Sequence, residues 1–234
     1  MVKHRKAVII FSRYNSIRLP GKALKRINGR ELLGRVIDRA RLVDADMPVI
    51  VATSTESTDD RIAKFSEMNG VSCYRGDLCN VLKRAIDTCK KFDVDVFARI
   101  CGDRPFFSPE LTLAGFHQFD DNLDLLSSQP NLSLPPGLTT EIVKVSALEK
   151  VIRTTTKKED LEHFTRFIYK NSSMFRIKTF NLSEPIKGWT RLVIDNEKDL
   201  RKARWIAEFF SSAKLANTPY TEIIRYAVEY DNSF

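Results

Sequence analysis

The chain has 234 residues with a formal net charge of +8, and 43% of its residues are hydrophobic. This length and composition predict one large globular domain with a buried core and exclude a disordered or low-complexity chain. Nowhere does an apolar run reach the length of about 18 residues that a membrane-spanning helix needs, so an integral helical membrane protein is excluded.

The N-terminal segment and the cysteines favour the cytoplasm. The first six residues lead directly into an apolar run, so we expect no signal peptide. The four cysteines (Cys73, Cys79, Cys89 and Cys101) contain no C-x-x-C pair, which favours reduced thiols. We therefore predict a cytoplasmic protein that does not bind a membrane.

Positive charge is concentrated near the N-terminus, where residues 1–41 contain twelve Lys and Arg against two acidic residues. A nucleic-acid-binding protein usually spreads its cations along a face and interleaves them with aromatic residues. The concentration in one segment instead favours a compact anion such as a triphosphate. Six of these cations are better explained as a solvent-exposed helix face: Lys25, Arg26, Arg30, Arg35, Arg39 and Arg41.

Strands and helices alternate through the first half of the chain. Apolar, β-branched runs predict strands over 6–11, 48–53, 71–74 and 94–100. Apolar residues at helical spacing predict helices over 31–40, 58–69, 80–91 and 108–120. Such alternation requires an α/β fold with a doubly wound, mainly parallel sheet and right-handed crossovers.

The loop after the first predicted strand has the composition of an anion site. It carries three cations, Arg13, Arg18 and Lys22. Its small or turn-forming residues let backbone N–H groups approach a ligand, and these are Ser12, Asn15, Ser16 and Gly21. Ligands of doubly wound folds sit beyond the carboxyl ends of the strands, where this loop begins. A merely cationic surface loop is the alternative, but the sequence favours a phosphate site.

The alternation breaks in the second half of the chain. Strands are predicted over 123–127, 139–145, 174–182 and 191–194, and helices from 146 onward and over 159–171, 197–210 and 220–230. The strand over 139–145 alternates like one with an exposed face, and Ser146 with Glu149 predicts a capping box. We interpret residues of about 128–188 as a small inserted arm on a single domain that spans 1–234.

Two aspartates follow predicted strands. Asp103 lies in Arg99-Ile-Cys-Gly-Asp-Arg-Pro105, and Asp195 follows the strand over 191–194. If both strands are central, their ends open on the same edge as the basic loop, where carboxylates suit Mg²⁺ bound to phosphate oxygens. The alternatives are local, because Asp103 can form an Asx-turn before Pro105 and Asp195 can cap the next helix.

These segments resemble a known family. Arg13-x-x-Ser16-x-Arg18-Leu19-Pro20-Gly21-Lys22 is similar to the N-terminal signature of the cytidylyltransferases that activate acidic sugars, particularly the spore-coat polysaccharide type. This group also includes the 3-deoxy-manno-octulosonate and acylneuraminate enzymes. The segments at Asp103 and Asp195 resemble the family's Arg-x-x-Gly-Asp-x-Pro and Val-Asp-Thr-Pro-Glu-Asp-Leu segments, with Arg104 and Asn196-Glu197 as departures.

The resemblance implies a CTP-dependent cytidylyltransferase with a Rossmann-like nucleotidyltransferase fold, an acidic small-molecule acceptor, and a homodimer formed through the arm. It also implies Mg²⁺ held by Asp103 and Asp195. The catalytic residues would be Arg13, Lys22, Asp103 and Asp195. The nucleotide would be bound by Arg13, Ser16, Arg18, Gly21, Lys22 and Arg84, although Arg84 alone is equally well explained as a solvated cation on a helix.

Two further segments resemble the acceptor half of the spore-coat type: Pro136-Gly137-Leu-x-x-Glu141 and Glu162-His163-x-Thr165. His163 by itself, on an amphipathic helix, is more often structural. The arm also contains apolar residues that would form an exposed patch for a dimer, and these are Leu132, Leu134, Leu138, Phe164 and Ile168.

Two other classes of function stay open. A nucleic-acid-binding module would explain the isoelectric point of about 9.3 but not two aspartates at strand ends. A glycosyltransferase that uses a nucleotide-sugar typically needs an Asp-x-Asp pair after a strand. The pair Asp93-Val-Asp95 precedes a predicted strand instead.

Overall fold

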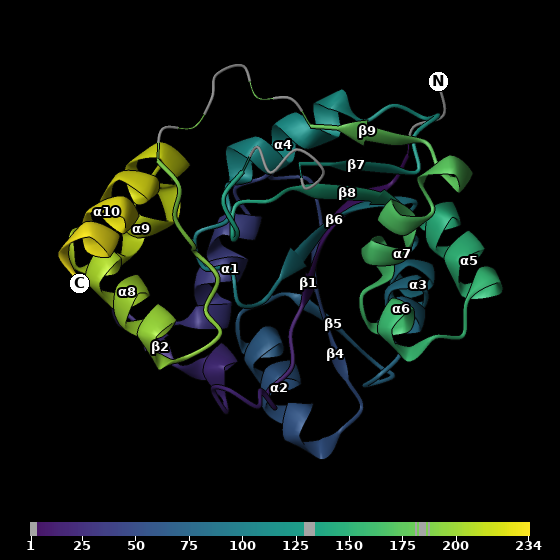
Figure 1. Ribbon diagram of the computed structural model, residues 1–234. Coiled ribbons are helices and arrows are strands. Elements are labelled where there is room, and N and C mark those ends of the chain that lie inside the picture. The colour runs from purple at the N-terminus through teal and green to yellow at the C-terminus, as the bar shows by residue number, and fades with distance from the viewer. Residues whose placement is uncertain (1–3, 129–133, 181, 183–185, 187) are drawn as a thin grey trace.

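A seven-stranded sheet forms the centre of the molecule, with the strand order β5-β4-β1-β6-β8-β7-β9 (Figure 1). The computed structural model describes residues 4–128, 134–180, 182, 186 and 188–234. The strands of the sheet are β1 (Lys6–Phe11), β4 (Val49–Ser54), β5 (Ser72–Gly76), β6 (Val96–Cys101), β7 (Leu125–Ser127), β8 (Glu141–Lys144) and β9 (Ile177–Thr179). A separate antiparallel pair is formed by β2 (Arg26–Ile27) and β3 (Arg30–Glu31).

Strand β1 shows why the sheet is parallel and buried. It pairs in parallel with β4 on one side and β6 on the other. Its residues Val8 and Ile10 pack into one core, while Ala7 and Ile9 pack into the core on the opposite face. This period of two, with apolar residues on both faces, requires a covering layer on each side of the sheet. The predicted doubly wound, mainly parallel α/β fold is confirmed.

The helices form these two covering layers (Figure 1). One layer contains α3 (Val81–Phe92), α5 (Val145–Thr154), α6 (Lys158–Glu162) and α7 (Phe164–Lys170). The other contains α1 (Leu32–Ala40), α2 (Asp60–Met68), α4 (Pro109–Gln118), α8 (Glu197–Glu208), α9 (Ser212–Asn217) and α10 (Tyr220–Ser233). Within the described ranges, no helix combines the length and the apolar character needed to cross a membrane.

The region expected as an arm contributes to the sheet itself. It supplies β8, which lies between β6 and β7 and is antiparallel to both, and β9 at the edge. The expectation that β8 has an exposed face is wrong, because Glu141, Ile142 and Val143 are all buried. Helices cover both faces of this strand, so its polar residues, Glu141 and Lys144, do not mark a solvent-facing side.

The apolar patch expected on the arm is also buried within one chain. Leu134, Leu138, Phe164 and Ile168 are each at most 1% exposed, because they pack into the two cores. Leu132 lies outside the described residues. The homodimer therefore stays a prediction, and this patch no longer supports it.

Three local predictions in the second half are wrong. Residues 191–194 form no strand and instead run as an extended segment, in which Ile194 N donates to Asp103 O at 2.9 Å. The helix over 159–171 is broken at His163 into α6 and α7. Helix α5 begins at Val145 without a side-chain cap, so the capping box at Ser146 is not formed.

Two of the arginines expected on a solvated helix face are buried. Arg35 and Arg39, both on α1, are each 2% exposed. Arg39 donates hydrogen bonds to the carbonyl oxygens of Phe107, Leu215, Ala216 and Thr218 at 2.6–3.2 Å. Burial lowers the pKa of Arg39 to about 10. These arginines therefore attach the C-terminal helices to α1 and are not available to a ligand.

We expect Arg39→Met to lower the free energy of unfolding by about 1–3 kcal/mol, because buried carbonyl oxygens would lose their donor. Urea unfolding followed by circular dichroism measures this change. Arg201→Met on α8 is the control, since Arg201 is exposed and its replacement should leave stability within about 0.5 kcal/mol. Equal stability of the two variants would contradict the structural role of Arg39.

Candidate active site

The carboxyl ends of β1 and β6 meet closely and form the base of a site. Gly102 N donates to Phe11 O at 2.8 Å. A Cβ atom on Gly102 would lie 2.8 Å from the Cβ of Ser12, so only glycine allows this approach. The close contact brings the loop after β1 beside Asp103.

The loop after β1 is held in shape by its own contacts. Tyr14 N donates to Asp59 Oδ1 at 2.6 Å, and Gly21 N donates to Tyr14 O at 3.1 Å. Gly21 has a φ of +66° and lies against the ring of Tyr14, which a side chain at this position would contact at 3.0 Å. The turn at Gly21 leads into a 3-10 helix, Lys22–Leu24, and directs the Lys22 side chain inward.

Lys22 joins the two aspartates that the sequence singled out. Its Nζ donates to Asp103 Oδ2 at 2.8 Å and to Asp195 Oδ1 at 3.2 Å. A third hydrogen bond, of 2.8 Å, reaches Ile194 O. The Lys22 side chain is only 15% exposed. One ammonium group thus lies between two carboxylates from distant parts of the chain.

Asp195 is not the cap of the following helix. Asn196 caps α8, since its Oδ1 accepts from Asp199 N at 3.0 Å and Asp199 Oδ2 accepts from Asn196 N at 3.1 Å. The side chain of Asp195 is therefore free to face Lys22. It reaches the site on an extended segment and not on a sheet strand, which corrects the premise of two central strands.

The charges around Asp195 keep it ionised. Burial alone raises the pKa of Asp195, but Lys22, Arg18 and Arg191 together lower it below its ordinary value. Arg18 Nη2 lies 3.1 Å from Asp195 Oδ1, and Arg191 pairs with the other carboxylate oxygen. Arg191 is not among the site residues expected from the sequence, because its apolar neighbours predict only a strand.

These residues open onto a pocket of about 370 Å³, which we call the Lys22 pocket. Its polar lining combines the basic loop with α3, β6 and the break between α6 and α7. The residues that line it are Phe11, Ser12, Arg13, Ser16, Ile17, Arg18, Lys22, Ala23, Val81, Arg84, Arg99, Cys101, Gly102, Asp103, Glu162, His163 and Asp195.

A family model described as Cytidylyltransferase matches residues 7–215. This range includes β6, all of β1 except its first residue, the basic loop and both aspartates. The chain belongs to the cytidylyltransferase family. The cytidylyltransferase resemblance and the nucleotidyltransferase class that it implies are thereby confirmed.

The chain is also similar to a known protein in sequence and to solved structures in fold. The chain is 29% identical to the spore coat polysaccharide biosynthesis protein SpsF of Bacillus subtilis, over 82% of this chain and 81% of that protein. A cytidylyltransferase from Leptospira borgpetersenii shares the fold with a TM-score of 0.90, at 23% identity over 98% and 96% of the two chains. A CMP:2-keto-3-deoxy-manno-octonic acid synthetase complexed with CTP has a TM-score of 0.68, at 19% identity over 88% and 100%.

The other residues expected at the nucleotide of this cytidylyltransferase, Arg13, Ser16 and Arg84, all line the Lys22 pocket. Arg13 and Ser16 line the Lys22 pocket, and Arg13 also lies 3.5 Å from Glu162 Oε1. Arg84 is 3% exposed and donates to Asp77 O at 3.0 Å, so its interpretation as a solvated cation is wrong. Asn15, a turn-forming residue of the basic loop, donates to Thr58 Oγ1 at 3.2 Å and so helps to hold the loop in shape.

The two aspartates fit a divalent cation that is shared with a substrate. The Lys22 ammonium already occupies a cation position between them. Within the described ranges, no three His, Cys, Asp or Glu side chains come together to hold a metal ion. Mg²⁺ commonly binds through one or two carboxylates together with substrate phosphates, and this donor set provides two carboxylates.

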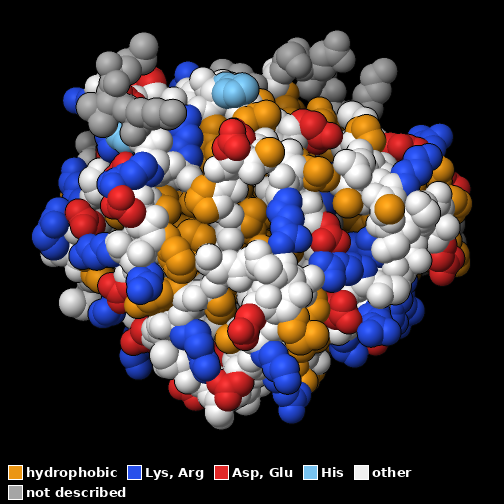
Figure 2. Space-filling model, turned by 180° about the vertical axis from the view of Figure 1, so that it is seen from behind, with side chains coloured by type: hydrophobic (Ala, Val, Ile, Leu, Met, Phe, Trp, Pro, Cys, Tyr) orange, Lys and Arg blue, Asp and Glu red, His pale blue; other side chains and the backbone are white. Residues whose placement is uncertain are grey.

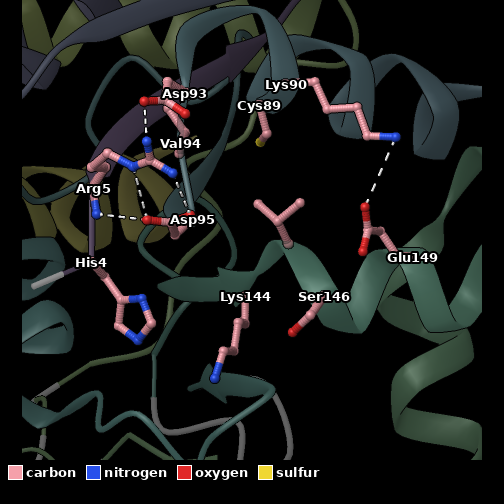
Figure 3. A pocket seen from close by; sticks show the side chains of 11 residues that line it. His4, Arg5, Cys89, Lys90, Asp93, Val94, Asp95, Lys144, Ser146 and Glu149 are labelled. Atoms are coloured by element: carbon pink, nitrogen blue, oxygen red, sulfur yellow. Dashed lines mark hydrogen bonds and ion pairs between the residues drawn. The ribbon is translucent and has the colours of Figure 1, made fainter. Parts of the chain in front are cut away.

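A second hollow of about 580 Å³ lies at the opposite, amino end of the parallel strands (Figure 3). Most of its charged side chains pair with one another, and Lys144 donates to Asp121 O outside the hollow. Arg5 pairs with both Asp93 and Asp95, and Lys90 lies 3.9 Å from Glu149. Asp93 and Asp95 are the Asp-x-Asp pair that a glycosyltransferase would need, and this cytidylyltransferase holds them far from the Lys22 pocket.

Proposed function

We propose that this chain transfers the cytidylyl group of CTP to an oxygen of an acidic acceptor, a sugar acid or similar small acid, and releases pyrophosphate. The observation that carries the proposal is Lys22 between Asp103 and Asp195 at the edge of a basic pocket. Membership of the cytidylyltransferase family supports CTP as the nucleotide. The acidic acceptor is supported by the excess of cations that line the pocket.

The residues of the pocket match the demands of this reaction. In-line attack on the α-phosphorus needs no covalent intermediate, so the protein has to position two substrates and offset negative charge. We assign the phosphates to Arg13, Arg18 and Lys22. Arginine offers two parallel N–H donors to phosphate oxygens, whereas lysine acts as a point charge. Arg84 lines the same pocket from α3, and we assign it to the nucleotide base.

We infer that Asp103 and Asp195 hold Mg²⁺ together with the phosphates of CTP. The ion, when bound, supplies Lewis acidity at the phosphoryl group. The carboxyl of Asp195 stays ionised even at pH values well below neutral, because its cationic neighbours lower its pKa. Asp103 is fixed beside it by the hydrogen bond from Ile194 N to Asp103 O. These two side chains therefore present a preformed pair of carboxylates to the nucleotide.

The test is release of pyrophosphate from CTP with a panel of acceptors: 3-deoxy-manno-octulosonate, N-acetylneuraminate and a hydroxyalkyl phosphonate. At least one acid should release pyrophosphate with CTP and Mg²⁺, and none should release a nucleoside phosphate from a nucleotide-sugar. No release from CTP with any acid would overturn the proposed function. Transfer from a nucleotide-sugar would favour the glycosyltransferase class.

We expect CTP with Mg²⁺ to raise the melting temperature more than ATP or GTP does. A ligand that binds only the native state stabilises it by mass action, by about 2.7 kcal/mol at a hundred times its Kd. Differential scanning fluorimetry at equal nucleotide concentrations measures this difference. Equal shifts for all three triphosphates would remove the preference for cytosine.

A nucleic-acid-binding protein is less consistent with the distribution of charge. Figure 2 shows one face on which Lys and Arg side chains are interspersed with Asp and Glu side chains. Arg35, Arg39 and Arg84 contribute to the positive net charge but are buried. Salt-dependent retention of random DNA in the absence of CTP would favour this alternative.

A further inference from the structure

A row of polar side chains crosses three strands beneath the Lys22 pocket. Arg99 on β6, Glu141 on β8 and Ser127 on β7 lie at the same level of the sheet, since Ser127 pairs with Glu141 and Ala98 pairs with Ile142. Tyr169 of α7 reaches this row from the covering layer. The rest of this sheet face packs into an apolar core, so the row is an exception that needs a reason.

The row is tightly hydrogen-bonded. Arg99 Nη1 donates to Glu141 Oε2 at 2.7 Å, and Tyr169 Oη donates to Glu141 Oε1 at 2.5 Å. Ser127 Oγ lies 2.6 Å from Tyr169 Oη. Burial raises the pKa of Glu141, but Arg99, Tyr169 and Arg104 together lower it below its ordinary value. Glu141 is therefore a buried carboxylate that fixes the guanidinium of Arg99 from one side.

Most of the hydrogen-bonding capacity of Arg99 is unused. A guanidinium has five N–H donors, and within the described ranges Glu141 is the single hydrogen-bonding partner of this one. Its Nε is buried without a partner, although the side chain lines the Lys22 pocket. The ring of Phe164 lies 5.0 Å from the guanidinium carbon and supports it from the covering layer.

The local charge balance also calls for an anion. Arg104 donates to Thr139 O and Thr139 Oγ1, and it also acts on Glu141 electrostatically, while its Nε is buried without a partner. Glu141 therefore faces two arginines with a single negative charge. Buried charges are costly unless they are paired, and a bound anion would provide the missing partner.

We propose that Arg99 binds the carboxylate of the acceptor in the Lys22 pocket, and that Glu141 and Tyr169 are positioning residues that hold its guanidinium. This inference rests on the proposed function and adds the residue that selects an acid. A guanidinium matches the planar fork of a carboxylate. Arg99 comes from β6, apart from the loop cations that we assign to the phosphates, so both anionic substrates have separate partners.

The experiment compares an acid with its uncharged form. The acid is whichever of the two sugar acids of the panel, 3-deoxy-manno-octulosonate or N-acetylneuraminate, releases pyrophosphate faster from CTP, and its methyl ester keeps the hydroxyl groups without the charge. At saturating CTP, we expect wild-type kcat/KM to be about 10- to 100-fold higher for the acid, as a charge-assisted hydrogen bond implies. Isothermal titration with CTP alone gives a second measurement, independent of turnover.

The main variant removes both charges of the buried pair. Arg99→Met alone would leave Glu141 buried and unpaired and so endanger folding. We therefore use Arg99→Met together with Glu141→Gln, in which the preference for the acid over the ester should fall to about one while CTP affinity stays unchanged. A wild-type preference retained in this variant would overturn the role of Arg99 and leave the proposed function standing. If the variant loses only CTP affinity, Arg99 binds the nucleotide, and its role at the acceptor carboxylate is likewise overturned.

Tyr169→Phe tests positioning. It removes the hydrogen bond to Glu141 without touching the pocket, so the KM for the acid should rise a few-fold while the KM for CTP stays constant. Tyr226→Phe, in the C-terminal helices, is the matched control and should change neither value. Unchanged acceptor KM in Tyr169→Phe would reject the positioning role. If wild type turns over no acid at all, the proposed function fails and this inference fails with it.

Discussion

Asp103→Asn and Asp195→Asn are each expected to lower turnover about a thousandfold, which corresponds to roughly 4 kcal/mol of transition-state stabilisation. Each change keeps the shape of the side chain but removes one of the two charges that we assign to Mg²⁺. A weaker metal site would leave negative charge at the α-phosphorus less well neutralised. Single-turnover pyrophosphate release at saturating CTP measures the effect.

The chain offers a matched control for Asp195 in the next residue. Asn196 is the true cap of α8, so Asn196→Ala should cost about 1 kcal/mol of stability and leave the chemistry intact. Asp195→Asn should show the reverse, with a stable fold and little turnover. If Asp195→Asn keeps near-normal turnover, the carboxylate is not a metal ligand and its role is limited to holding Lys22.

The first half of the fold was predictable because its signals are local. Strand β1 is a short β-branched run with apolar residues on both faces, and this pattern has few interpretations other than a central parallel strand. The basic loop follows it directly in the chain. Proximity in sequence therefore equalled proximity in space, and the loop could be assigned to the edge of the sheet before any contact was known.

The second half depends on partners that the local pattern does not contain. Strand β8 has a polar residue at each end, Glu141 and Lys144, yet Glu141 points into the interior because Arg99 and Tyr169 meet it there. In the sequence, a glutamate of a buried ion pair cannot be told from a solvent-facing one. Arg39 is a similar case, since carbonyl oxygens from residues more than sixty positions away make a helix cation part of the interior.

The candidate site likewise combines residues that local motifs identify with contacts that only the fold reveals. Sequence motifs singled out Lys22, Asp103 and Asp195 and placed them at the same edge of the sheet, but they predicted no direct contact between the lysine and the two carboxylates. The structure places the three together, over separations of 81 and 173 residues. Asp195 arrives on an extended segment that has no sheet partner, and no periodicity predicts where such a segment lies.

Lys22→Met is expected to lower kcat/KM for CTP by about 10- to 100-fold, because a charge-assisted contact contributes about 1.5–3 kcal/mol. The change also alters Asp195. Burial would still raise the pKa of this carboxyl, while the attraction of Lys22, which lowers it, would be gone. The acid limb of the pH–rate profile should therefore move to higher pH, and the measurement is kcat/KM for CTP between about pH 4 and pH 8.

The sign of the stability effect follows from the same shift. In wild type the folded-state pKa of Asp195 lies below the ordinary 3.8, so its stabilisation is present above that value and is lost only as the pH falls through the lower one. In Lys22→Met this stabilisation is smaller, and its loss begins at higher pH, which urea midpoints at a series of acidic pH values detect. Lys25→Met is the control and should leave the acid limb and the urea midpoints unchanged. Lys25 directly follows the same 3-10 helix, and its ammonium makes a long ion pair of 4.0 Å with Glu197. An acid limb that stays in place in Lys22→Met, together with normal CTP kinetics, would remove Lys22 from the site.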